Sequence, residues 1–308
     1  MKTFCTVSTR SHLNQTLGLV RSVAGYGGQW HFRILVVEPE QGIVEGHEDD
    51  VKYTIEGLHS LRQNEAAASL MDHYRKKPDN LRWSLKPIWM DYLLEEGYEQ
   101  VIYVDNDIVF FNDPTFLFEE LDTASILLNP HWRIKEPDID ADWFIVNFRD
   151  GVYNGGFVGA SQQGREALQW WSRCCEFACE KDYKRGLFDD QKYLDLMPAA
   201  FADVRILQHR GCNVAYWNEY ENMRSIENGQ VMINEIWPVV FVHFTDDLIK
   251  QMERGNEAGR GIHAGHRKAF VHEEPGQRPA VPTTQIEDGR AGRKFARPCT
   301  HGLNPDRR

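Results

Sequence analysis

The chain has 308 residues, of which 42% are hydrophobic and 26% charged, as expected for a folded globular protein with one large or two small domains. The formal net charge of −11 argues against a general nucleic-acid binder, because such proteins normally carry an excess of basic residues. The amino terminus lacks a signal-like apolar run, no segment reaches transmembrane length, and the six cysteines show no disulfide-framework spacing. Reduced thiols and a cytoplasmic location are therefore expected.

The amino-terminal part alternates between strand-like and helix-like patterns. Strands are predicted over 4–9 and 32–38, and helices over 12–26, 55–71 and 84–97. The last of these helices has Pro87 in its first turn and Gly97 at its end. This alternation predicts an α/β fold with a doubly wound, mostly parallel central sheet flanked by helices, in which ligands bind beyond the carboxyl ends of the strands.

The remainder of the chain is more mixed. Strands are predicted over 125–128, 155–160, 206–207, 215–217 and 239–244, and helices over 164–182 and 189–197, the latter ended by Pro198. Residues 138–150 are predicted to form a loop with some structure. From about residue 255 the hydrophobic periodicity disappears, so we expect a single domain over 1–254 and an irregular tail over 255–308. This basic tail is either solvated or in contact with an anionic membrane surface or glycan.

The most informative segment is the apolar run 101–111, which is interrupted by Asp105-Asn106-Asp107. Burying an ionised carboxylate is costly unless a cation or hydrogen bonds offset it. Alternate residues of a strand share a face, so Asp105 and Asp107 are predicted to point the same way. Two converging carboxylates at a strand end suit Mg²⁺ or Mn²⁺, usually together with a substrate phosphate.

Four further segments place polar or glycine residues where ligand-binding loops occur: 153–159, 186–192, 212–218 and 241–245. Asn154 precedes two glycines, which either let the backbone approach a ligand closely or form a tight turn. Asp189 can cap the next helix, which would place Asp190 and Gln191 in its first turn, facing a pocket. His243 lies among apolar residues at a strand end, as a core residue or as a metal ligand.

Taken in order, these motifs resemble the nucleotide-diphospho-sugar glycosyltransferases of GT-A fold, which have a Rossmann-like sheet. The most similar group is the bacterial one related to glycosyltransferase family 8, often found with surface-polysaccharide assembly. The resemblance covers residues 4–246 and rests on segments 4–10, 84–87, 105–107, 154–159, 186–191, 213–218 and 242–244. One departure is that His243 is followed by Phe-Thr-Asp-Asp and not by the glycine- and lysine-containing phosphate motif of the better-known family 8 enzymes.

The resemblance implies transfer of a sugar from a nucleotide-diphosphate donor, expected to be a UDP-sugar, to a glycan, a lipid-linked or another hydroxyl acceptor. The implied ligands of the metal, Mn²⁺ or Mg²⁺, are Asp105, Asp107 and His243. The implied donor-binding residues are Ser8, Thr9, Lys86, Asp105 and Asn106. The residues implied at the reacting sugar are Asn154, Asp190 and Gln191, and the candidates on the acceptor side are His131, Trp217 and Asn218.

Family 8 enzymes retain the anomeric configuration, which implies attack by the acceptor on the face that the diphosphate leaves. If Asp190 instead reached the acceptor hydroxyl, it would act as a general base and the reaction would invert. Two other readings stay open. Asp105-Asn106-Asp107-Ile108-Val109 also fits the DxDx[TV] motif of haloacid-dehalogenase-like phosphatases, with Asp105 as the nucleophile. The chain could also be a non-catalytic sugar-nucleotide- or glycan-binding protein on a degenerate transferase scaffold. In either case the expected location is the cytoplasm, free or peripheral at the inner face of the membrane.

Overall fold

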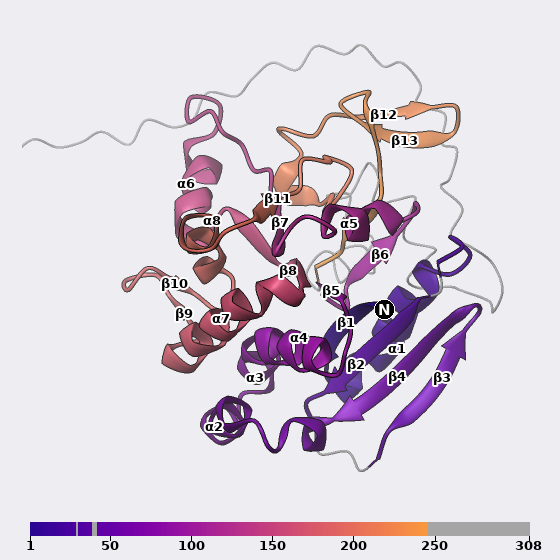
Figure 1. The fold of residues 1–308 in the computed structure, drawn as a ribbon. Helices are drawn as coiled ribbons and strands as arrows, with labels where there is room; N and C mark the ends of the chain where they lie inside the picture. Colours follow the sequence, from indigo (N-terminus) through magenta and orange to yellow (C-terminus); the bar gives the residue numbers. More distant parts are fainter. Residues whose placement is uncertain (29, 39–41, 246–308) are drawn as a thin grey trace, which may run out of the picture.

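The computed structural model describes residues 1–28, 30–38 and 42–245, so the predicted tail over 255–308 and its membrane contact lie outside the described residues. An eight-stranded sheet forms the centre of the molecule (Figure 1). In spatial order its strands are β11 (Val204–Ile206), β7 (Ile126–Pro130), β8 (Tyr153–Ser161), β5 (Gln100–Val104), β1 (Lys2–Ser8), β2 (His31–Val36), β4 (Val51–Gly57) and β3 (Val44–Glu48). All strands except β8 and β3 run in one direction. The predicted α/β fold with a mostly parallel sheet is therefore confirmed.

Helices cover both faces of this sheet because neighbouring strand residues point to opposite sides. On β5, Tyr103 packs into one core cluster and Ile102 into the other. The first cluster lies under α2 (Glu65–His73), α3 (Pro78–Ser84), α4 (Lys86–Glu95) and α7 (Arg165–Phe177). The second lies under α1 (Leu13–Ser22) and α5 (Thr115–Glu120). Among the described residues, no helix combines the length and the apolar character needed to cross a bilayer.

The other elements are short and lie around the carboxyl edge and the ends of the sheet (Figure 1). They are the helices α6 (Ala141–Asp150) and α8 (Met197–Ala200), the strands β6 (Ile108–Phe110), β9 (Lys181–Asp182), β10 (Leu187–Phe188), β12 (Arg224–Glu227), β13 (Gln230–Ile233), β14 (Trp237–Pro238) and β15 (Phe241–His243), and the 3-10 turns η1 (Arg10–His12), η2 (Leu58–Leu61), η3 (Gln162–Gly164), η4 (Lys192–Leu196) and η5 (Tyr216–Asn218).

The predicted helix over 55–71 is wrong in its first part, which belongs to strand β4 and turn η2. The segment Val51–Gly57 is rich in β-branched and aromatic residues, which favour a strand. The helix α2 begins only after Asn64, whose side chain accepts a hydrogen bond from the amide of Ala67. The predicted helix over 84–97 is observed as α4, and α3, which was not predicted, precedes it. The predicted helix over 164–182 ends at Phe177. Residues 138–150, predicted as a loop, contain the helix α6.

Two predicted elements beside the carboxyl edge are also corrected. The predicted strand over 215–217 is the 3-10 turn η5, reached through Asn213 in the left-handed region at φ 59°. The predicted helix over 189–197 begins only at Lys192, as η4, because Asp189 has φ 39° and forms a turn. Pro198 lies in the first turn of α8 and does not end a helix. Proline suits that position because its missing N–H would have no partner there.

The order of the strands creates a switch point in the sheet. From β1 the chain continues to β2 on one side, whereas β5, on the other side of β1, leads on to β7 and β8. Loops that leave β1 and β5 therefore diverge and open a crevice at their carboxyl ends, where open α/β sheets bind ligands. The residues that follow β5 are Asp105, Asn106 and Asp107.

Candidate active site

Asp105 and Asp107 lie in a turn between β5 and β6. The prediction that they share the face of one strand is wrong, although their carboxylates do converge. The amide of Asp105 donates to the carbonyl of Gly156 at 2.8 Å, and the amide of Ile108 donates to the carbonyl of Asp105 at 3.1 Å. The turn, and not strand alternation, therefore orients the two acids.

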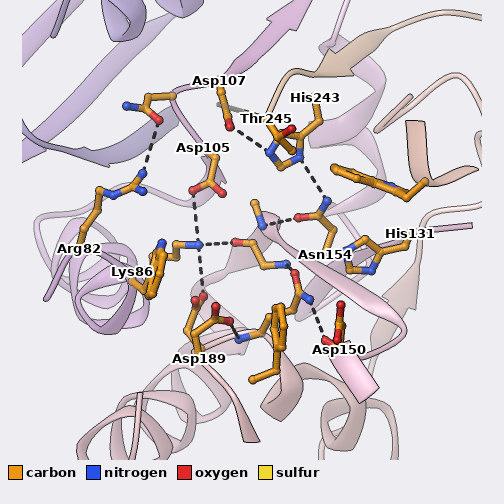
Figure 2. Close-up of a pocket in the computed structure, with 18 of the residues that line it drawn as sticks. Arg82, Lys86, Asp105, Asp107, His131, Asp150, Asn154, Asp189, His243 and Thr245 are labelled. Carbon is orange, nitrogen blue, oxygen red and sulfur yellow. Dashed lines mark hydrogen bonds and ion pairs between the residues drawn. The ribbon is translucent and has the colours of Figure 1, made fainter. Parts of the chain in front are cut away.

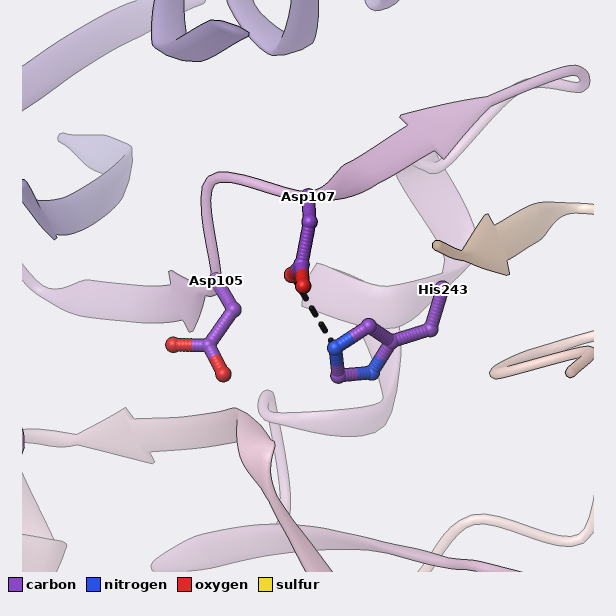
Figure 3. Close-up of side chains that lie close together, drawn as sticks. All are labelled: Asp105, Asp107 and His243. Atoms are coloured by element: carbon purple, nitrogen blue, oxygen red, sulfur yellow. Dashed lines mark ion pairs between the residues drawn. The ribbon is translucent and has the colours of Figure 1, made fainter. Parts of the chain in front are cut away.

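Pairing of β6 with β15 completes this cluster. The two strands are antiparallel, with His243 opposite Ile108. Ligand atoms of Asp105, Asp107 and His243 all lie within 4.8 Å of one another (Figure 3). Two carboxylates and one imidazole are a donor set that fits a divalent cation such as Mn²⁺ or Mg²⁺.

The imidazole of His243 is oriented by two buried asparagines. Its Nδ1 lies 3.2 Å from Oδ1 of Asn213, and Asn154 Nδ2 lies 3.2 Å from the same nitrogen. A proton on Nδ1 donated to Asn213 leaves Nε2 for the metal, the arrangement usual for a metal-binding histidine. That Nε2 lies 3.0 Å from Oδ1 of Asp107. Burial lowers the pKa of His243, but Asp107 outweighs it and raises the pKa above the ordinary value, so a metal ion would compete with a proton for Nε2.

Lys86 is a buried cation beside this cluster (Figure 2). It is the first residue of α4, and its ammonium group lies 3.4 Å from Asp105 Oδ1 and 3.2 Å from Asp190 Oδ2. It also donates to the carbonyl of Gly155 at 2.9 Å. Burial would lower the pKa of Lys86, but Asp105 and Asp190 raise it above its usual value, so the lysine stays charged. The positive charge of Lys86 is thus fixed in the cavity wall, next to the carboxylates.

The acidic neighbours of Lys86 have different pKa values. Burial, with the nearby Asp189 and Asp105 carboxylates, raises the pKa of Asp190 to about 7 against the attraction of Lys86. Burial also raises the pKa of Asp105, but Lys86 and Arg82 outweigh that effect and the net pKa is lowered. The net effect favours the ionised form of Asp105, whereas burial favours the protonated form of Asp190.

Gly156 allows these groups to approach one another. A Cβ atom at this position would lie 2.6 Å from His243 Cε1, 2.8 Å from Asn154 Oδ1 and 2.8 Å from Asp105 Oδ2. These distances are shorter than van der Waals contact, so any larger residue would displace His243, Asn154 and Asp105. At Gly155, a Cβ atom would lie 3.1 Å from Asp190 Oδ2. The pair of glycines predicted to allow close approach does so toward the protein's own side chains.

These groups line a cavity of about 460 Å³ at the carboxyl edge of the sheet. The predicted site residues that contribute to its wall are Lys86, Asp105, Asn106, Asp107, His131, Asn154, Asp190, Gln191, Trp217 and His243. His131 follows β7 directly, and its ring lies against Trp217 with centroids 5.5 Å apart. Trp217 in turn meets the ring of His243 at 5.2 Å. The wall is therefore continuous from the acidic cluster to the predicted acceptor side.

Three predicted site residues do not line this cavity. The Ser8 hydroxyl is bonded to Thr16 at 2.8 Å, and the Thr9 hydroxyl lies 2.6 Å from Nδ1 of His12, which does reach the wall. Asn218 is a positioning residue, since its Nδ2 donates to the carbonyls of Asn213 at 2.8 Å and His131 at 3.2 Å. In the described segment 8–12, at the end of β1 and in the turn that follows it, only His12 lines the cavity.

The amide of Gln191 is held by the backbone on both sides. Its Oε1 accepts from the amide of Gly155 at 3.0 Å, and its Nε2 donates to the carbonyl of Asp150 at 2.8 Å. In Asn154, Oδ1 accepts from the amide of Gly156 at 2.6 Å. Both side chains are therefore fixed in the wall of the cavity.

Several wall residues were not among the predicted site residues: His12, Arg82, Trp83, Arg133, Asp150, Lys181, Phe188, Asp189, Tyr216 and Thr245. Arg82 stands four residues before Lys86, and its Nη1 lies 3.5 Å from Oδ1 of Asn106. Two basic residues four positions apart, shortly before the strand that leads to the aspartates, could have identified Arg82 from the sequence. Arg133, two residues after His131, gave no comparable signal because nothing local marks it as buried.

No family model matches the chain. The chain is 28% identical over 249 residues to the protein YfnD of Bacillus subtilis (strain 168), a match that covers 79% of this chain and 76% of YfnD. It is 27% identical over 277 residues to YfnF of the same strain, covering 88% of this chain and 89% of YfnF. Both relatives are described as uncharacterized proteins.

Similar solved structures include three glycosyltransferases. Mouse xyloside xylosyltransferase 1 in its apo form has a TM-score of 0.47 at 12% identity, covering 80% of this chain and 99% of its own. The galactosyltransferase LgtC with donor and acceptor sugar analogs has a TM-score of 0.44 at 12% identity, covering 68% and 74%. A glycosyltransferase involved in glycosylation of the major capsid of PBCV-1 has a TM-score of 0.45 at 12% identity, covering 82% and 98%.

Proposed function

We propose that the chain is a metal-dependent glycosyltransferase of GT-A fold, which moves a sugar from a nucleotide-diphosphate donor, expected to be a UDP-sugar, to a hydroxyl acceptor. The observation that carries the proposal is the meeting of Asp105, Asp107 and His243 with the buried Lys86 at the switch point of the sheet. That combination provides a metal site and a fixed cation in one cavity, which are the groups needed to hold a diphosphate.

The reaction breaks the bond between the anomeric carbon and a diphosphate oxygen, so negative charge develops on the leaving group. The metal, when bound, would neutralise part of that charge. Lys86 supplies a further positive charge from the protein, and its contacts with Asp105 and Gly155 hold its ammonium in place before substrate arrives. Such preorganisation costs no rearrangement at the moment of reaction.

The sugar would lie toward Asp190, Asn154 and Gln191, which share a wall of the cavity. In a retaining reaction the acceptor hydroxyl attacks from the face that the diphosphate leaves, and its proton passes to the departing diphosphate. In an inverting reaction Asp190 would take that proton, for which a pKa of about 7 is suitable. We favour retention because Asp190 is already paired with Lys86 and is deeply buried.

A donor screen tests the proposal. Hydrolysis of a panel of UDP-, GDP- and CDP-sugars is measured with Mn²⁺ and with EDTA, and the first-formed anomer is followed by NMR. We expect hydrolysis of at least one UDP-sugar that requires the metal and yields the retained anomer. Metal-independent activity on every donor would overturn the metal-dependent assignment, and an inverted first product would overturn retention.

The phosphatase reading is tested in parallel with p-nitrophenyl phosphate. A phosphatase would turn this substrate over rapidly and lose the activity in Asp105→Asn. We expect no such turnover. A donor that binds with Mn²⁺ but is neither hydrolysed nor transferred would favour the non-catalytic binding protein.

A further inference from the structure

The cavity contains another buried cation besides Lys86, two residues after His131 in the sequence. Arg133 lines the wall and is only 9% exposed. Its Nη1 donates to the carbonyl of Gly151 at 2.7 Å, while its Nε is buried without a hydrogen-bond partner. A guanidinium group carries several donors in a fixed planar fork, so one backbone carbonyl leaves most of its capacity unused.

No described carboxylate forms an ion pair with Arg133. Asp150 is held by Arg149, with Nε at 2.5 Å from Oδ1 and Nη2 at 3.0 Å from Oδ2. Asp195, the other nearby acid, is held by Lys192 at 2.7 Å and by the amide of Val152 at 2.8 Å. Burial lowers the pKa of Arg133 to about 10, and Asp150 offsets this effect only in part. Arg133 therefore has acidic residues nearby but no direct ion-pair partner among the described residues, unlike most buried arginines.

The backbone around Arg133 is built to place it in the cavity. Trp132 has φ 54°, in the left-handed region that a bulky residue rarely adopts. The residues on both sides of it, His131 and Arg133, line the cavity, while the ring of Trp132 stacks on the guanidinium of Arg210 at 3.6 Å. This strained turn is held by that contact, as strained backbone at ligand sites commonly is.

The proposed function assigns the nucleotide diphosphate to Lys86 and the candidate metal ligands, which leaves Arg133 for another anion. In the close-up, Lys86 and Asp105 lie on one side and His131 and Asp150 on the other, with His243 and Asn154 between them (Figure 2). The side of the cavity around Arg133 also carries Trp217 and Tyr216, whose rings suit a sugar face. This end is where the transferred sugar and the acceptor would meet.

We propose that Arg133 forms an anion subsite that binds a carboxylate or phosphate group carried by one of the two sugar substrates. The proposal rests on the proposed sugar transfer for the identity of the carrier, but the anion subsite itself follows from the geometry of Arg133. A planar guanidinium binds either anion through two parallel hydrogen bonds, which also fixes the orientation of the sugar. The subsite would therefore select charged sugars over neutral ones.

The first test uses inorganic phosphate and acetate on the metal-free protein, with chloride at equal ionic strength as reference. We expect phosphate or acetate to raise the melting temperature of the wild type, because a ligand that binds only the folded state stabilises it. The stabilisation should disappear in Arg133→Gln and persist in Lys184→Gln, which removes one exposed positive charge outside the cavity wall. Equal stabilisation in wild type and Arg133→Gln would overturn the subsite, as would no stabilisation of the wild type.

The second test finds the carrier of the anion by calorimetry with Mn²⁺. The donor arm compares UDP-glucuronate with UDP-glucose, and the acceptor arm compares glucuronate and glucose 6-phosphate with glucose in the presence of UDP. We expect the charged member of one arm to bind about tenfold more tightly, because hydrogen bonds to charged groups are stronger than those between neutral groups. Arg133→Gln should remove that preference and leave the neutral member unchanged. A preference that survives in Arg133→Gln would overturn the proposal.

The two proposals can fail separately. Failure of UDP to bind with Mn²⁺ would overturn the sugar-transfer function, while an effect of phosphate that depends on Arg133 would still support the anion subsite. Conversely, tight UDP binding without any response to anions would retain the proposed function and remove the subsite.

Discussion

Arg33 and Arg133 are equally buried residues, each 9% exposed, but their surroundings are opposite. Arg33, on β2, is bonded to Glu56 on β4 through Nε at 2.9 Å and through Nη2, and Nη1 lies 3.3 Å from the Tyr98 hydroxyl. Glu56 is in turn bonded by Ser60 at 2.9 Å. Burial would lower the pKa of Arg33, but Tyr98 and Glu56 raise it above the usual value. Arg133 lacks such partners, and its pKa is lowered.

This difference in ion pairing distinguishes two groups of buried charges. The closed cluster of Arg33, Glu56 and Tyr98 stabilises the fold, whereas the open cluster of charged residues that line the cavity is available to a ligand. The cluster around Arg33 lies between the sheet and α4, with Trp89 against the guanidinium at 5.7 Å, and its donors are used within the protein. The cavity instead contains buried donors without a partner: Asn106 Nδ2, Arg82 Nε, Arg133 Nε and Trp217 Nε1. Unpaired buried donors are costly, so a polar ligand in the cavity would be stabilised by pairing with donors along its wall.

The largest expected effect comes from breaking the closed cluster. Arg33→Met should lower the free energy of unfolding by about 3–5 kcal/mol, because Glu56, only 2% exposed, would be left as an uncompensated buried charge. Urea denaturation measures this change. A loss below about 1 kcal/mol, the range of an exposed ion pair, would show that Arg33 and Glu56 are not the structural pair inferred here.

Substitutions in the open cluster at the cavity should instead affect activity. Asp107→Asn is expected to lower metal-dependent turnover about 100- to 1,000-fold, since one metal ligand and the charge that balances the cation are lost. The melting temperature should stay close to that of the wild type. Turnover of the best donor is measured across a Mn²⁺ titration, with His243→Gln as a second ligand variant. Unchanged turnover in both variants would contradict the assigned metal site.

Gly156→Ala tests whether the metal site depends on close packing. The added Cβ would meet His243, Asn154 and Asp105 at 2.6–2.8 Å, so the ligands must move apart. We expect metal affinity to fall about 10- to 100-fold, the size of effect seen when the groups that orient metal ligands are disturbed. Gly18→Ala is a matched control, because no atom lies within 4 Å of a Cβ placed there. Equal metal affinity in the two variants would refute the packing argument.

His31 extends the cluster of Arg33, Glu56 and Tyr98, because its Nδ1 lies 2.7 Å from the Tyr98 hydroxyl, and it should affect stability at low pH. Burial and the charge of Arg33 lower the pKa of His31 from 6.5 to about 4. Between these values the unfolded chain binds a proton that the folded chain does not, so stability falls as the pH drops from 6.5 to about 4. His31→Gln should lose this part of the pH dependence. Thermal unfolding of the two proteins across that range measures it, and parallel curves would exclude a contribution from His31.

The smallest effect on stability is expected for Arg133→Met, which makes the same substitution as in the closed cluster. Arg133 has no ion-pair partner among the described residues, so its removal leaves no other buried charge uncompensated. The free energy of unfolding should therefore change by less than about 1 kcal/mol or rise. Urea denaturation beside Arg33→Met gives the comparison directly. Equal destabilisation of both variants would mean that Arg133 is also a structural residue.

The sequence determined the parts of the site that depend on local pattern. An apolar run that stops at Asp105 and Asp107, a glycine pair after Asn154, and a histidine within an apolar strand are each unusual by themselves, because burial of polar groups needs compensation. These residues meet in the cavity, as expected. The alternation of strands and helices likewise predicted the mostly parallel sheet, since hydrophobic periodicity is a local property.

Only the tertiary structure decided how these residues are used. Pairing of β6 with β15 brings His243 to the aspartates, and a turn rather than a strand orients the acids. The hydroxyl of Ser8 is turned to Thr16, and the side chain of Asn218 to the backbone, because partners distant along the chain or in an unpredicted turn satisfy them. The contrast between Arg33 and Arg133 has the same origin. The local sequence does not distinguish the two arginines. Whether each one forms an ion pair depends on which carboxylates the fold brings within reach.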